Sequence, residues 1–131
     1  MQILILANHS GGLYDFRKDL IAALKQHAEV SVAVPRNDRW DELQALADRV
    51  IELPIDRRGM NPARDAKLLG QYRAILKRLR PDLVILFTNT VSHKMARCAV
   101  VEAERANANI IRCHTSSQAA LNEILDKAAA V

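Results

Sequence analysis

Residues whose side chains can bind anions or move protons follow three short apolar segments of this 131-residue sequence. They carry hydroxyl or imidazole groups, or are glycines that allow a backbone to approach a ligand closely. They are His9, Ser10, Gly11, Gly12, Thr88, Ser92, His93, His114, Ser116 and Ser117. Such groups at a helix N-terminus bind phosphate and other anions. The pattern indicates a candidate site for a small anionic ligand such as phosphate.

Other kinds of site fit these residues less well. Gly11 and Gly12 do not form a GxGxxG fingerprint, and no acidic residue ends the second apolar segment to hold a ribose. An ordinary turn is the simpler interpretation of the two glycines. His9, His93 and His114 lack the spacing of a zinc motif, and no GxSxG elbow surrounds a serine. The sequence therefore predicts no metal, no cofactor and no catalytic residue.

The elements that would position these residues alternate along the chain. Short apolar segments rich in β-branched residues predict five strands, at 2–7, 30–34, 50–53, 83–87 and 110–113. Longer segments between them repeat apolar residues three or four apart, as helices do. Strands that are apolar throughout are expected where helices cover both faces of a parallel sheet. We therefore expect one doubly wound, Rossmann-like α/β domain over residues 1–131, with five parallel strands in the order 3-2-1-4-5 and helices on both faces.

This strand order predicts where a ligand binds and where several helices begin or end. Ligands of such sheets bind beyond the carboxyl ends of the strands, where the order reverses, here between the first and fourth strands. Pro62 is expected at the first position of the third helix, and Asp38 is expected to cap the short helix before it. A last helix is expected after Thr115. The final 61 residues contain no glycine, so a left-handed helix end there is expected at Asn107 or Asn109.

Basic residues are concentrated in one part of the chain. The formal net charge is +4, but residues 49–80 hold nine basic and three acidic residues. The basic residues include the loop pair Arg57-Arg58 and the helical residues Arg64, Lys67, Lys77 and Arg78. A solvated helix face is the simpler interpretation, and a surface for anionic lipid or a phosphorylated substrate is the alternative. Nucleic acid is disfavoured, because aromatic residues make up 4% of the chain and no binding motif appears.

The compartment is expected to be the cytoplasm. No apolar run reaches the roughly 18 residues that a membrane helix needs, and the N-terminus lacks the basic region of a signal peptide. Cys98 and Cys113 form neither a metal-binding pair nor a secreted disulfide framework, so we expect both to act as small hydrophobic residues.

Three stretches within residues 1–86 carry a family likeness: MQILILANHSGGLYDFRKDLIAAL, VAVP and IELPIDRRGMNPARDAKLLGQYRAILKRLRPDLVI. They resemble the N-terminal domain of bacterial family-4 glycosyltransferases with the GT-B architecture. These enzymes build capsular and related surface polysaccharides, and their N-terminal domain presents the acceptor. The resemblance implies that Ser10, Gly11 and Gly12 face the inter-domain cleft, and that Arg57 and Arg58 lie near the acceptor side.

Residues 87–127 do not continue this likeness. Their Val91-Ser92-His93 turn and their Ser116-Ser117 pair look more like a small bacterial Rossmann-like family of unknown function. Two partial likenesses suggest a chimeric or designed chain with a join near residues 86–90.

The resemblance also implies what the chain does not do. Family-4 enzymes bind the nucleotide sugar mainly in a second domain, through two glutamates eight positions apart, and no two glutamates here have that spacing. We therefore expect a stand-alone domain without catalysis of its own, so not an enzyme. A natural glycosyltransferase N-terminal domain and a small module for an anionic or sugar ligand remain the alternatives. The sequence does not indicate an oligomeric state.

Overall fold

Strands and helices alternate through the described part of the chain. The computed structural model describes residues 2–7, 10–36, 38–53, 62–87, 93–113 and 126. The elements are β1 (Gln2–Leu6), α1 (Ser10–Lys25), β2 (Glu29–Val34), α2 (Trp40–Leu46), β3 (Arg49–Glu52), α3 (Pro62–Leu79), β4 (Leu83–Phe87), α4 (His93–Arg105) and β5 (Asn109–Cys113). All five predicted strands are present, and each predicted boundary is within one residue of the observed one.

The strands form one parallel sheet with the order β3-β2-β1-β4-β5. Each neighbouring pair is parallel, so every strand has its carboxyl end at the same edge. In the central strand, Ile3 lies opposite Val30 on one side and Leu83 on the other. The predicted Rossmann-like α/β topology is thus confirmed.

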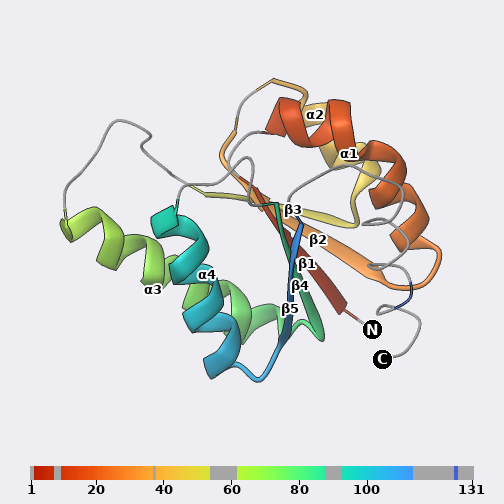
Figure 1. Ribbon diagram of the computed structural model, residues 1–131. Coiled ribbons are helices and arrows are strands. Elements are labelled where there is room, and N and C mark those ends of the chain that lie inside the picture. Colours follow the sequence, from red (N-terminus) through yellow and green to blue (C-terminus); the bar gives the residue numbers. More distant parts are fainter. Residues whose placement is uncertain are drawn as a thin grey trace.

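Helices cover both faces of this sheet, with α1 and α2 on one side and α3 and α4 on the other (Figure 1). Side chains alternate between the faces because successive residues of a strand point in opposite directions. On β1, Ile3 and Ile5 belong to the core under α1 and α2. Leu4 and Leu6 belong to the core under α3 and α4. Two buried faces explain why the strands are apolar throughout.

The helix ends test the predicted boundaries. α3 begins at Pro62, and Asn107, just after α4, has the left-handed φ of 56° expected there. The predicted Asp38 cap is wrong, because the N-cap of α2 is Arg39, with φ 64° and no side-chain cap hydrogen bond. The helix expected after Thr115 lies outside the described residues. No helix among the described residues is long and apolar enough to cross a bilayer.

Candidate functional site

The chain leaves two adjacent strands in opposite directions at the carboxyl edge of the sheet. β1 and β4 are parallel neighbours, and Leu6 lies opposite Leu86 near their ends. β1 leads into α1, whose Leu13 packs on the face shared with α2. β4 leads into α4, whose Ala99 and Ala103 pack on the opposite face. Ligands of doubly wound domains bind at such a point, where connections diverge from neighbouring strands.

Three predicted site residues form the start of α1. The helix begins at Ser10, so Gly11 and Gly12 lie in its first turn, and no described glycine has a positive φ. The Ser10 side chain is fully buried, and its hydroxyl donates a hydrogen bond to the main-chain oxygen of Asp38, at 2.8 Å. Ser10 therefore joins the start of α1 to the loop after β2. Main-chain N–H groups in the first turn of a helix have no partner within the helix.

Of the other predicted site residues, only His93 falls within the described residues, as the first residue of α4. Ser10 and His93 thus begin the two helices that leave the sheet at the point of divergence. The remaining predicted residues lie outside the described part of the chain: His9, Arg57, Arg58, Thr88, Ser92, His114, Ser116 and Ser117. For these eight residues the predicted ligand site therefore stays a prediction.

Arg39 holds the loop after β2 against two helices, a role that no sequence pattern indicated. Its guanidinium lies 3.5 Å from a carboxylate oxygen of Asp15 on α1 and 3.6 Å from one of Glu42 on α2. The residue adopts the left-handed region with φ 64°. A left-handed conformation costs a non-glycine residue roughly 1 kcal/mol or more. The ion pairs and the Ser10 hydrogen bond connect this loop to α1 and α2.

A second cation in this loop was also missed by the sequence analysis. The guanidinium of Arg36 lies over the ring of Trp40, 5.7 Å from its centroid. Trp40 is partly buried and packs against the core under α1 and α2, so it is a fixed platform for the arginine. Cation–π contacts of this kind are found within about 6 Å of the ring. An arginine two residues after a strand has no sequence signal that distinguishes it from other surface arginines.

Metal binding finds no support among the described residues, which contain no group of three or more His, Cys, Asp or Glu placed to hold an ion. Cys98 is half-buried on α4 and packs against the core under α3 and α4, in agreement with a small hydrophobic role. Cys113 ends β5, and its side chain lies outside the described residues.

Comparisons with known proteins bear on both parts of the sequence. A bacterial family described as an uncharacterized protein conserved in bacteria (DUF2325) matches residues 65–128. This match includes the residues expected to resemble a bacterial Rossmann-like family of unknown function.

A glycosyltransferase matches most of the chain. The N,N'-diacetylbacillosaminyl-diphospho-undecaprenol alpha-1,3-N-acetylgalactosaminyltransferase of Campylobacter jejuni is 30% identical over 107 residues. The alignment covers 81% of this chain and 27% of that protein. The chain therefore spans just over a quarter of the length of this relative.

Solved structures share the fold at low sequence identity. The C-terminal domain of a hydrogenase from Pyrococcus furiosus matches 86% of this chain and 89% of its own, with a TM-score of 0.64 and 15% identity. UDP-GlcNAc 2-epimerase from Neisseria meningitidis, bound to UDP-GlcNAc, matches 86% of this chain and 32% of its own, with a TM-score of 0.61 and 16% identity. The chain is thus a Rossmann-like α/β domain that resembles bacterial glycosyltransferases.

Proposed function

We propose that this chain is the acceptor-side domain of a glycosyltransferase-like protein, and that it binds a small anionic ligand without catalysing a reaction itself. The ligand site is the carboxyl edge between β1 and β4. The observation that carries the proposal is the divergence of α1 and α4 to opposite faces from these neighbouring strands. Phosphate or the diphosphate of a nucleotide sugar is the ligand class that this edge fits.

Two helix N-termini support an anionic ligand. α1 has 16 residues and α4 has 13, and both begin at this edge of the sheet. A helix N-terminus carries a partial positive charge and N–H groups without partners in the helix, and both favour a phosphate. Because the Ser10 hydroxyl is engaged by Asp38, we assign the contact there to the main chain of Ser10, Gly11 and Gly12.

The side chains assigned to the ligand are those predicted from the sequence. They are His9, Thr88, Ser92, His93, His114, Ser116 and Ser117 near the strand ends, with Arg57 and Arg58 on the acceptor side. The names of two similar proteins support this ligand class. One is a transferase named for a diphospho-linked sugar, and the other was solved with UDP-GlcNAc bound.

Absence of catalysis is the second part of the proposal. The chain has no two glutamates eight positions apart, the pair with which family-4 enzymes are expected to hold the nucleotide sugar. Groups that stabilise developing charge usually supply the largest part of an enzyme's rate enhancement, so binding alone does not produce transfer. We further propose that residues 1–131 act as one domain in the cytoplasm and do not bind nucleic acid.

A chimeric or designed origin, with a join near residues 86–90, stays a prediction. The family match begins at residue 65, and the alignment with the transferase takes up 81% of the chain. Both matches therefore extend across the expected join, and neither places a boundary at it. A natural sequence that aligns without a break from Met1 to residue 127 would contradict the chimeric origin.

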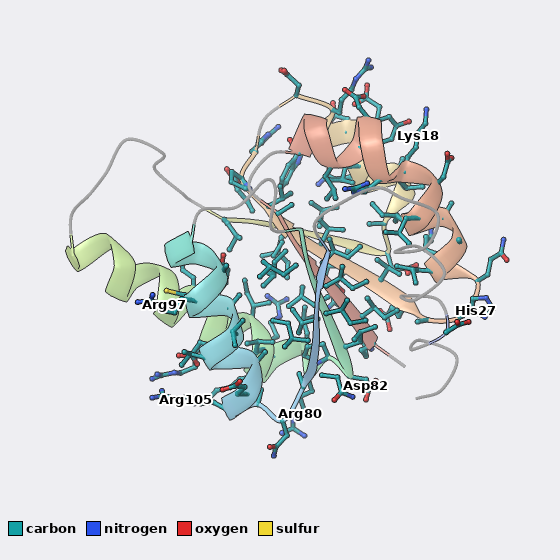
Figure 2. The ribbon with its side chains drawn as sticks, in the orientation of Figure 1. Lys18, His27, Arg80, Asp82, Arg97 and Arg105 are labelled. Atoms are coloured by element: carbon teal, nitrogen blue, oxygen red, sulfur yellow. The ribbon has the colours of Figure 1, made fainter. Side chains whose placement is uncertain are left out.

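Calorimetric titration with UDP-GlcNAc and with inorganic phosphate tests the ligand site. We expect His93→Ala to weaken binding about tenfold, the equivalent of one charge-assisted hydrogen bond. His27→Ala is the matched control, because His27 lies between α1 and β2 at the opposite edge of the sheet (Figure 2). Equal weakening by both substitutions, or no binding of either ligand, would overturn the site.

Release of UDP from UDP-GlcNAc tests the absence of catalysis. We expect no release above the rate in buffer, with or without a sugar acceptor. A turnover that disappears when the protein is unfolded by heat would show that the chain is an enzyme.

A further inference from the structure

A hydroxyl in the core under α3 and α4 has no hydrogen-bond partner among the described residues. It belongs to Tyr72 on α3, which is 1% exposed and packs with the other buried residues of this core. Buried polar groups are nearly always hydrogen-bonded, so a buried hydroxyl without a partner calls for an explanation. A phenol hydroxyl can donate one hydrogen bond. The core between the two helices therefore contains a donor that is available to another atom.

Cys98 lies on the side of α4 that faces α3. It precedes Glu102 by four residues, so the two side chains lie on the same side of the helix. Glu102 accepts two hydrogen bonds from Arg73 of α3, which identifies this side as the one that faces α3. Cys98 packs against the same core as Tyr72 and is half-buried, so it can also be reached from solvent. It is not part of a disulfide.

The Tyr72 ring extends to the level of Cys98. Both helices run from the carboxyl edge of the sheet to the amino edge, because each connects strands of one parallel sheet. Long side chains of a helix point back toward its N-terminus. Tyr72 precedes Arg73 on α3, so its ring extends about one turn before the Arg73–Glu102 pair, where Cys98 lies on α4. Burial, and then the charge of Cys98, raise the pKa of Tyr72, as expected for two groups this close.

Cations predominate around this part of α4. Arg97 adjoins Cys98 in the sequence and is exposed, as is Arg105 further along the helix (Figure 2). Glu102 is paired with Arg73 at 3.2 Å and with Arg105 at 3.8 Å, so its charge is offset. The thiolate is the form of cysteine that reacts with peroxides, and nearby arginines favour it. The surroundings of Cys98 therefore suit a reactive thiol.

We propose that Cys98 is a site of oxidation by hydrogen peroxide, and that the Tyr72 hydroxyl binds the oxidised group. The thiolate sulfur attacks one peroxide oxygen, so that an S–O bond forms while the O–O bond breaks. The sulfur is oxidised by two electrons to a sulfenic acid, and the peroxide is reduced. Its second oxygen leaves as hydroxide, which combines with the proton released by the thiol to form water. The oxygen retained on the sulfur accepts the hydrogen bond that Tyr72 donates to no described residue of the reduced chain.

A single oxygen atom is the group that fits this position. Tyr72 is 1% exposed, so its hydroxyl is reached by an atom attached to the half-buried sulfur and not by a bulky molecule from solvent. In the reduced chain the thiol packs as a small hydrophobic residue. The site lies between α3 and α4 and uses no residue of the edge between β1 and β4. It is therefore independent of the proposed ligand site, and each can fail without the other.

Trapping of the sulfenic acid with dimedone tests the site. The full chain is treated with hydrogen peroxide, and peptide mass spectrometry measures the label at Cys98 and at Cys113, the second cysteine of the sequence. We expect label at Cys98, and we expect Tyr72→Phe to lower it about fivefold, the equivalent of one hydrogen bond. The label at Cys113 should not change. Tyr14→Phe is the matched control at a partly buried tyrosine of α1 and should leave both labels within about twofold.

Thermal unfolding gives a second readout, which a merely structural role of Tyr72 would not move. Oxidation should raise the Tm of the wild type by about 4 °C, because the buried hydroxyl gains a partner. The rise should be absent in Tyr72→Phe and in Cys98→Ala, which controls for oxidation of other residues. An unchanged or lower Tm of the oxidised wild type would overturn the hydrogen bond to Tyr72. No dimedone label at Cys98, a disulfide between Cys98 and Cys113 in its place, or equal labelling in the wild type and Tyr72→Phe would overturn the proposal.

Discussion

Arg73 on α3 and Glu102 on α4 form a bidentate ion pair. Arg73 Nε donates to Oε2 and Nη2 donates to Oε1, both at 3.2 Å. Glu102 exposes 2% of its side chain, whereas Arg73 is about half exposed. The hydrogen bond to the carboxylate, and then its charge, raise the pKa of Arg73. The pair joins α3 to α4.

Replacing the buried carboxylate of Glu102 tests how much this ion pair contributes to stability. We expect Glu102→Gln to lower the free energy of unfolding by about 1–2 kcal/mol, because an amide cannot accept two charge-assisted hydrogen bonds. Glu104→Gln is the matched control on the same helix, where the side chain is exposed. That change should stay within about 0.5 kcal/mol of the wild type. Equal effects in urea unfolding would show that the pair contributes nothing measurable.

The hydroxyl of Tyr72 predicts how stability depends on alkaline pH. Tyr72 is 1% exposed, and its oxygen has no hydrogen-bond partner among the described residues. Burial, and to a lesser degree the neighbouring Cys98, raise the pKa of the phenol. Below a pH of about 10 the phenol is neutral in both the folded and the unfolded chain. Above it, only the unfolded chain loses the proton, so stability falls as pH rises.

Tyr72→Phe removes this titration. We expect the variant to be up to about 1 kcal/mol more stable at neutral pH, because it no longer buries an unpartnered hydroxyl. Its advantage over the wild type should grow above a pH of about 10. Tyr14→Phe on α1 is the control and should leave the alkaline loss of stability in place. A constant difference between wild type and Tyr72→Phe from neutral to alkaline pH would contradict the assignment.

The fold was predictable because its signals are local or follow from general rules. Strands such as Leu83–Phe87 are apolar on both faces, and only a sheet covered on both sides buries both. Pro62 marks a helix start because its fixed φ suits the first position and it lacks an N–H that would be unpaired there. The strand order is the one that the Rossmann-like pattern implies, and right-handed parallel connections are compatible with it.

The finer features depend on contacts between distant residues. Asp38 looked like an N-cap from its type and position, yet the N-cap is Arg39, whose guanidinium lies within ion-pair distance of Asp15 and Glu42. The Ser10 hydroxyl was expected at a ligand, and its partner is a main-chain oxygen 28 residues away. Neither partner is visible in a local pattern. The site was therefore predictable as an edge of the sheet, and its individual contacts were not.

The left-handed backbone of Arg39 reverses an ordinary substitution rule. Alanine usually stabilises a chain relative to glycine because glycine loses more backbone freedom on folding. At φ 64° we expect the opposite, with Arg39→Gly about 1 kcal/mol more stable than Arg39→Ala. Both variants lose the ion pairs, so the difference between their stabilities measures the cost of the left-handed backbone conformation. The pair Arg36→Gly and Arg36→Ala, where φ is not positive, should show the usual order. If thermal unfolding shows the alanine variant to be more stable than the glycine variant at both positions, the backbone of Arg39 is not strained.

Two buried serines should respond oppositely to the same substitution. Ser10 and Ser31 expose 0% and 1% of their surface, respectively. The Ser10 hydroxyl donates to Asp38, whereas the Ser31 hydroxyl on β2 has no partner among the described residues. We expect Ser10→Ala to lower the free energy of unfolding by about 1 kcal/mol, because it leaves a main-chain oxygen without its donor.

Ser31→Ala should instead leave stability unchanged or raise it by up to about 1 kcal/mol, because it removes a hydroxyl that is buried without compensation. Urea unfolding of the two variants at the same pH measures both effects. A loss at position 31 as large as that at position 10 would show that the Ser31 hydroxyl has a partner in solution. An unchanged Ser10→Ala variant would show that the loop after β2 is held mainly by Arg39, whose ion pairs with Asp15 and Glu42 would then suffice.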